Sequence, residues 1–134
     1  MQIQEFEEGT KFIYLRQDEL DGGQYYILRP AAKLLQNTDV FAATLLYRKM
    51  IQSVLEKAQS KYYHYGAADL VTCGILSSSI IDWKSLEDHK QYLMGLEVVH
   101  KRKVSFWSEY ESALQKQATR DLKAIVRSAK NKAL

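Results

Sequence analysis

Apolar residues recur at steps of three and four along most of this chain, which is the spacing that lines one face of an α-helix. The clearest run carries apolar side chains at Val40, Ala43, Tyr47, Met50, Ile51, Val54, Leu55 and Ala58. Either Thr38 or Asp39 can accept hydrogen bonds from the free N–H groups of a first turn. The pattern therefore predicts a helix that begins at residue 40, with Asn37 in the linker before it.

Two more helices are predicted on either side of this run. The segment 25–36 follows a pair of glycines, and Pro30 should bend this helix or delay its start because proline lacks a backbone donor. The segment 62–78 carries little side-chain bulk at Gly66 and Gly74, which favours close approach of a neighbouring helix. Three consecutive serines then indicate where this helix ends.

The rest of the chain predicts two long helices and one short one. A helix over 86–100, capped by Asp82 or Ser85, is expected to bury Leu86, Tyr92, Leu93, Leu96 and Val99. The last helix should run from about Phe106 to near the C-terminus. Residues 12–20 suit either a short helix or a strand, and of the two a helix is expected.

These segments predict an all-α protein of five to six helices. Short turns between helices of such length favour antiparallel hairpins. No proline-rich or serine-rich linker divides the chain, so residues 1–134 are expected to form a single helical domain. Apolar residues make up 46% and charged residues 26% of the chain, the ordinary balance of a globular protein that folds alone.

Three stretches carry a family resemblance. They are the Leu-Leu-Tyr-Arg run at 45–48, the pattern at 65–70, and the Lys-Arg-Lys triplet at 101–103 followed by Phe106 and Trp107. With them, the region 43–110 resembles an uncharacterised bacterial α-helical family, that of the domain of unknown function 6880. This domain can follow a SWIM-type zinc finger in larger relatives and is similar to tetratricopeptide-like helical repeats.

The resemblance implies tetratricopeptide-like hairpins, stacked as helix pairs. It brings no catalytic residues to transfer, because none is assigned in the family. A SWIM finger requires a Cys-x-Cys and a later Cys-x-His, and Cys73 is the only cysteine of this chain. The finger itself is therefore not expected here.

The charge of the chain is strongly asymmetric. Residues 101–134 carry nine Lys or Arg and three Asp or Glu, whereas residues 1–100 carry ten and thirteen. On the last helix one stripe is basic, with Lys116, Arg120, Lys123, Arg127 and Lys130. A separate stripe is apolar, with Leu114, Ala118, Leu122, Ile125, Val126 and Ala129.

Such a basic amphipathic helix can pack on its own domain or on a partner, lie on nucleic acid, or lie on an anionic membrane. We expect an interaction module that binds a protein partner or a second copy of the chain, with nucleic-acid binding as the alternative. The candidate contact residues are Lys101, Arg102, Lys103, Lys116, Arg120, Lys123, Arg127 and Lys130.

Aromatic residues offer a second kind of contact. The tyrosines at positions 25, 26, 62, 63 and 65 are expected in the core or between paired helices, with base stacking or partner anchoring as the alternative. Phe106 and Trp107 are expected to lock the last helix onto the one before it, while the basic triplet meets that helix's negative end. Single-strand binding proteins also mix aromatic and basic residues in this way.

No constellation of residues predicts catalysis or metal binding. Cys73 is interpreted as a small buried residue, because no base lies near it in sequence. Glu97 and His100 have the spacing found in di-iron bundles, but a second such pair is missing. His89 and His100 share a helix face but lie roughly 16 Å apart along it, too far to share an ion. We expect no enzyme, cofactor or metal, although catalytic groups from distant parts of the chain could still assemble.

The expected location is the cytoplasm. The N-terminal residues are acidic, where a secretory signal needs positive charge, and no stretch approaches 18 uninterrupted apolar residues. The single cysteine excludes a disulfide within the chain and favours a reducing compartment.

Overall fold

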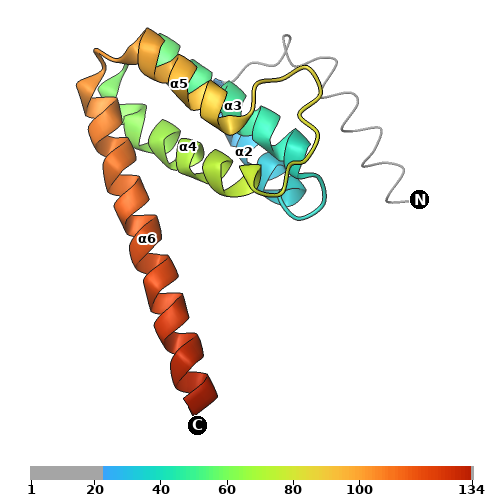
Figure 1. The fold of residues 1–134 in the computed structure, drawn as a ribbon. Helices are drawn as coiled ribbons and strands as arrows, with labels where there is room; N and C mark the ends of the chain where they lie inside the picture. The colour runs from blue at the N-terminus through green and yellow to red at the C-terminus, as the bar shows by residue number, and fades with distance from the viewer. Residues whose placement is uncertain (1–22, 134) are drawn as a thin grey trace.

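The computed structural model describes residues 23–133, and within that range the chain is all-α, as the spacing predicts (Figure 1). A short 3-10 turn, Ser60–Tyr62, precedes the third of the helices described. The α-helices are α2 (Tyr25–Leu35), α3 (Val40–Lys57), α4 (Tyr63–Ser77), α5 (His89–His100) and α6 (Val104–Ala133). The helix expected over 12–20 lies outside the described residues.

Helix α3 is the centre of the body, because α2 and α4 both pack against it. Asp39 is its N-cap, and the carboxylate accepts a hydrogen bond from the Ala42 backbone N–H at 3.1 Å. Its buried set is wider than one face and comprises Ala42, Ala43, Thr44, Leu45, Leu46, Tyr47, Met50, Ile51 and Leu55. Ala58, predicted on the apolar face, is instead the exposed left-handed residue that ends the helix.

Helix α2 continues through Pro30, which is exposed, rather than starting after it. Helix α4 confirms the expectation of close helix packing at its glycines. A Cβ added at Gly66 would lie 3.1 Å from Val54 Cγ1 of α3 and 3.3 Å from Phe106 Cε1 of α6. A Cβ at Gly74 would lie 3.1 Å from His89 Nε2 of α5.

Helix α5 begins later than predicted and is capped by a different residue. Asp88 and Gln91 form a capping box, in which each side chain accepts a hydrogen bond from the other residue's backbone N–H. The Asp82 carboxylate accepts from the Lys84 backbone N–H inside the preceding loop, so it does not cap the helix. Ser85 also lies in that loop, ahead of the helix.

The buried set predicted for α5 is only partly correct. Tyr92, Leu93 and Leu96 are partly buried and pack against the core. Leu86 lies in the loop before the helix and is half-buried, and Val99 is 73% exposed. Helix α5 therefore covers the core from one side and has no fully buried residue.

Helix α6 packs mainly against α4, not against the helix before it. Phe106 is fully buried and meets Tyr63 of α4 edge to face, with ring centroids 5.7 Å apart. The contact with α5 is made by Trp107, whose Nε1 donates a hydrogen bond to the His100 carbonyl at 3.0 Å. The outer half of α6, where residues 121–132 are all exposed, extends away from the other helices (Figure 1). A tetratricopeptide-like arrangement stays a prediction.

Candidate functional site

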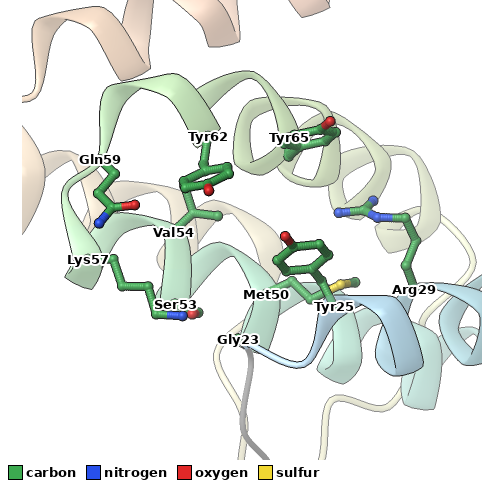
Figure 2. A pocket seen from close by; sticks show the side chains of 10 residues that line it. All are labelled: Gly23, Tyr25, Arg29, Met50, Ser53, Val54, Lys57, Gln59, Tyr62 and Tyr65. Atoms are coloured by element: carbon green, nitrogen blue, oxygen red, sulfur yellow. The ribbon is translucent and has the colours of Figure 1, made fainter.

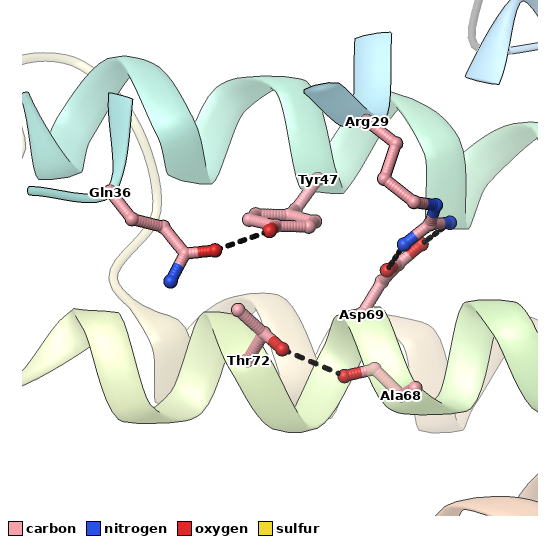
Figure 3. A network of polar contacts seen from close by, with 6 residues as sticks. All are labelled: Arg29, Gln36, Tyr47, Ala68, Asp69 and Thr72. Carbon is pink, nitrogen blue, oxygen red and sulfur yellow. Dashed lines mark hydrogen bonds and ion pairs between the residues drawn. The ribbon is translucent and has the colours of Figure 1, made fainter. Parts of the chain in front are cut away.

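Polar contacts inside the body tie helices together. Figure 3 shows the Arg29 guanidinium of α2 paired with the Asp69 carboxylate of α4, through contacts of 2.5 and 2.9 Å. Asp69 is 2% exposed, so burial raises the pKa of its carboxyl while the guanidinium opposes that rise. In the same view Tyr47 donates to Gln36 Oε1 at 2.5 Å, which joins α3 to the end of α2. These contacts satisfy buried groups and leave Arg29 with its charge matched.

The structure confirms that Cys73 is buried, as the sequence predicts. Cys73 is 0% exposed, and burial raises its pKa to about 12, so it stays protonated at neutral pH. Nearby, the Arg48 guanidinium lies 5.1 Å from the Trp83 ring centroid and 4.2 Å from that of Tyr92. Its Nη2 donates to the Glu87 carbonyl at 2.9 Å. This cluster anchors the 80–88 loop to the body.

The histidines lie apart from one another. His89 and His100 each have a buried Nδ1 without a hydrogen-bond partner among the described residues. Burial is the main cause that lowers both pKa values. His64 is exposed on α4. Residues 23–133 contain no group of three or more His, Cys, Asp or Glu placed to hold a metal ion.

Of the five tyrosines expected in the core or between paired helices, most lie outside the core. Tyr63 is 5% exposed and belongs to the core, but Tyr25 is 47%, Tyr26 69% and Tyr65 49% exposed. Tyr62 is half-buried. Three of these rings surround a hollow instead of packing on one another (Figure 2).

We call this hollow the tyrosine pocket. Its volume is about 380 Å³, and it lies where α2, the second half of α3 and the start of α4 meet (Figure 2). It is lined by Gly23, Tyr25, Arg29, Met50, Ser53, Val54, Lys57, Gln59, Tyr62 and Tyr65. This volume falls in the range of small-molecule sites.

The sequence does not predict this pocket, but the spacing of its lining residues accounts for which side chains share a face on each segment. Residues 25 and 29 are four apart on α2, residues 50, 53, 54 and 57 share one face of α3, and residues 62 and 65 are three apart. Each set is locally adjacent. Only the packing of the three segments brings the sets together.

The predicted basic contact residues do not form one patch. Lys101 and Arg102 are exposed in the turn before α6, and Lys103 is half-buried. No side-chain hydrogen bond joins this triplet to the part of the chain that the structure describes. At the end of α5 the His100 carbonyl accepts its side-chain hydrogen bond from Trp107 instead. The triplet lies about 20 Å along the helix from Lys116.

The basic residues farther along α6 fall into two groups. Lys116 and Arg120 line a groove between α6 and α4, together with His64. Lys123, Arg127 and Lys130 are exposed on the outer half of the helix, where residues 121–132 are all exposed.

The apolar stripe of α6, defined as Leu114, Ala118, Leu122, Ile125, Val126 and Ala129, has no cover from the described residues. Leu114 is 43%, Leu122 62%, Ile125 65% and Val126 46% exposed. The face of α6 turned toward α4 carries Phe106 and Ala113. At 100° per residue, that face lies roughly opposite the stripe. The stripe is therefore not the surface by which α6 packs on its own body.

Three comparisons with known proteins bear on identity, and none supplies an activity. None of the helices within residues 23–133 combines the length and apolar character needed to cross a membrane. No curated protein and no solved structure matches the chain. One family model matches residues 1–109, which include the whole body and the first turns of α6. The chain therefore belongs to the family described as a family of unknown function, DUF6880.

Proposed function

We propose that this chain is an interaction module that pairs with a second copy of itself through the apolar stripe of α6. The observation that carries the proposal is the exposure of four large apolar side chains along one line of a helix that projects from its body. Stripes of this kind mark association surfaces, because their burial between helices removes apolar area from water. In this proposal the chain acts by binding and has no catalytic role.

The sizes of the stripe residues suit an antiparallel pair. One register sets Leu114 opposite Ala129 and Ala118 opposite Ile125, so that large residues face small ones. The same register places the two-fold axis between residues 121 and 122, so the two Leu122 side chains lie beside each other across it. Such an interface uses the same surface on both copies, as in most dimers.

Charge supports the same orientation. The acidic residues of α6 are Glu109 and Glu111 near its start and Asp121 just past its middle, and after Asp121 the charged residues of the helix are all basic. The antiparallel register places Glu111 opposite Lys132, twice per pair. The basic stripe is turned about 140° from the apolar stripe, so the two basic faces of a pair would point apart.

Sedimentation equilibrium tests this pairing. The full chain should show a monomer–dimer equilibrium, and Leu122→Glu should abolish it because two carboxylates would meet at the axis. Ala124→Glu adds the same charge to the same turn but lies off the stripe, so it should pair like the unaltered chain. A chain that remains monomeric at millimolar concentration would exclude self-pairing.

A charge exchange tests the register. Glu111→Lys alone and Lys132→Glu alone should each weaken the dimer, because each sets like charges opposite one another. The double variant should restore it. Additive losses in the double variant would rule out this register while leaving the apolar contact in place.

Nucleic-acid binding is the second candidate, favoured by the exposed basic side chains of Lys123, Arg127 and Lys130. Binding to phosphates should fall steeply as salt rises, whereas pairing through apolar burial should not. Electrophoretic mobility of a random duplex and of a single strand, at low and at physiological salt, separates the two. Replacing the three basic residues by glutamine should remove any shift if phosphates are the partner.

A further inference from the structure

We infer that the tyrosine pocket is a binding site for an apolar carboxylate about the size of one aromatic amino acid side chain. This inference does not depend on the pairing of α6, because none of the residues that line the pocket belongs to that helix.

The interior of the pocket is apolar and adaptable. Met50, which is 1% exposed, and Val54 form its inner wall, and the rings of Tyr25 and Tyr62 stand on either side (Figure 2). Tyr25 is 47% exposed and Tyr62 is only half-buried, so part of each ring is left uncovered. Their faces therefore remain available to a flat or aliphatic group.

One end of the pocket is polar. Figure 2 shows Ser53, Lys57 and Gln59 gathered at the end away from Arg29. None of these three side chains has a polar partner among the described residues. Their hydroxyl, ammonium and amide groups can each donate a hydrogen bond to a bound ligand, and such donors suit a carboxylate.

The charges select an anion. Among the residues that the structure describes, no Asp or Glu lines the pocket and Asp69 already neutralises Arg29, so Lys57 is the charge left unmatched at the rim. An incoming carboxylate would neutralise it. The apolar wall and the polar end together therefore select a ligand with one apolar body and one negative end.

Three tyrosines around a hollow are also typical of a site that binds a methylated ammonium. The contacts of these rings disfavour such a ligand. Two of the rings already carry a protein cation. The Arg29 guanidinium lies 5.9 Å from the Tyr65 centroid, and the Lys61 ammonium lies 5.1 Å from the Tyr62 centroid. A third cation would also meet Lys57, and the lining residues that the structure describes include no acidic side chain to offset the repulsion.

Nuclear magnetic resonance titration of the full chain tests the inference, using the Met50 methyl group and the tyrosine rings as reporters. Phenylpropionate should bind with a dissociation constant on the order of 1 mM and shift these signals. Phenylpropionamide, which lacks the charge, should bind more weakly. Equal binding of the amide, tighter binding of phenyltrimethylammonium, or no localised shift would overturn the inference.

Matched variants locate the two ends of the site. Lys57→Gln should weaken phenylpropionate about fivefold and leave the amide unchanged, whereas Lys90→Gln, which removes an exposed charge of α5 that does not line the pocket, should change neither. Tyr25→Ala should weaken both probes by removing a wall, and Tyr26→Ala should not. Equal effects from Lys57→Gln and Lys90→Gln would contradict the assignment of Lys57.

A further titration distinguishes a free small acid from the C-terminal carboxylate of a polypeptide. N-acetylglycyl-phenylalanine carries the same ring and charge at the end of a peptide chain. If it binds at least as well as phenylpropionate, the site accepts the C-terminal residue of a polypeptide. If it binds much more weakly, the site is for a free small acid.

Discussion

His89 and His100 each bury one ring nitrogen without giving it a hydrogen-bond partner. Burial lowers both pKa values, and the positive charges of Arg48 and Lys103 add to the effect, while Asp88 and Glu56 oppose it. The unfolded chain therefore binds protons at these two sites more readily than the folded chain does.

The sign of the pH dependence follows directly. Because the folded pKa values lie below the unfolded value of about 6.5, stability should be fully present above that pH and fall as the pH drops below it. Urea unfolding at successive pH values between neutrality and mild acid measures the slope. Replacing both histidines by glutamine should flatten it, and an unchanged slope would assign the effect to other groups.

Ala58 is the residue at which the chain leaves α3. Its φ of 51° and ψ of 37° place it in the left-handed region, where a Cβ is unfavourable. Ala58→Gly should therefore raise the free energy of unfolding by about 0.5 kcal/mol, after the greater freedom of glycine in the unfolded chain is offset. Ala68→Gly, in the exposed interior of α4, should lower it by about 1 kcal/mol instead. Denaturant titration of both variants checks the opposite signs.

At the scale of the helices, the glycines of the body have different roles. A Cβ at Gly66 would press on Val54 and on the fully buried Phe106, which have little room to move. A Cβ at Gly95 would lie 3.9 Å from Glu87 Oε2, the free end of a flexible side chain. The first glycine is needed for packing and the second is not.

These contacts predict opposite outcomes for the same substitution. Gly95→Ala should stabilise the protein by about 1 kcal/mol, the difference in helix propensity. Gly66→Ala should destabilise it by about 1 kcal/mol, because overpacking outweighs that gain. Thermal or urea unfolding measures both. Stabilisation by Gly66→Ala would mean that α6 can shift away from α4 at little cost.

For the whole molecule, the body and the outer half of α6 should behave as separate parts. Residues 121–132 are exposed throughout, so their removal should not change the contacts inside the body. If the apolar stripe pairs two copies, association adds to stability by mass action.

A chain that ends at Arg120 tests this separation. Its unfolding temperature should not depend on protein concentration, whereas that of the full chain should rise with concentration. At the lowest concentration the two should agree within about 2 °C, because the body is the same. Lower stability of the shortened chain at every concentration would show that the outer half supports the body itself.

Local signals in the sequence predict the helices well. Asp39 caps α3 as expected, and the boundaries of α2, α3 and α4 fall within about two residues of the prediction, the usual uncertainty of helix ends. The start of α5 is the exception. Several polar residues between 82 and 88 can each cap a helix, and only the loop conformation selects Asp88.

The sequence by itself determined the all-α character, the lack of side-chain bulk at Gly66 and Gly74 that permits close approach, and the existence of two stripes on the last helix, because all three depend on residue type and spacing within one segment. The tertiary structure alone decided that α6 packs on α4, that three tyrosines surround a pocket, and that the apolar stripe has no cover from the described residues. Periodicity reveals that a helix has an apolar face. It carries no information about which surface, if any, buries that face, because this depends on contacts between residues far apart in the chain.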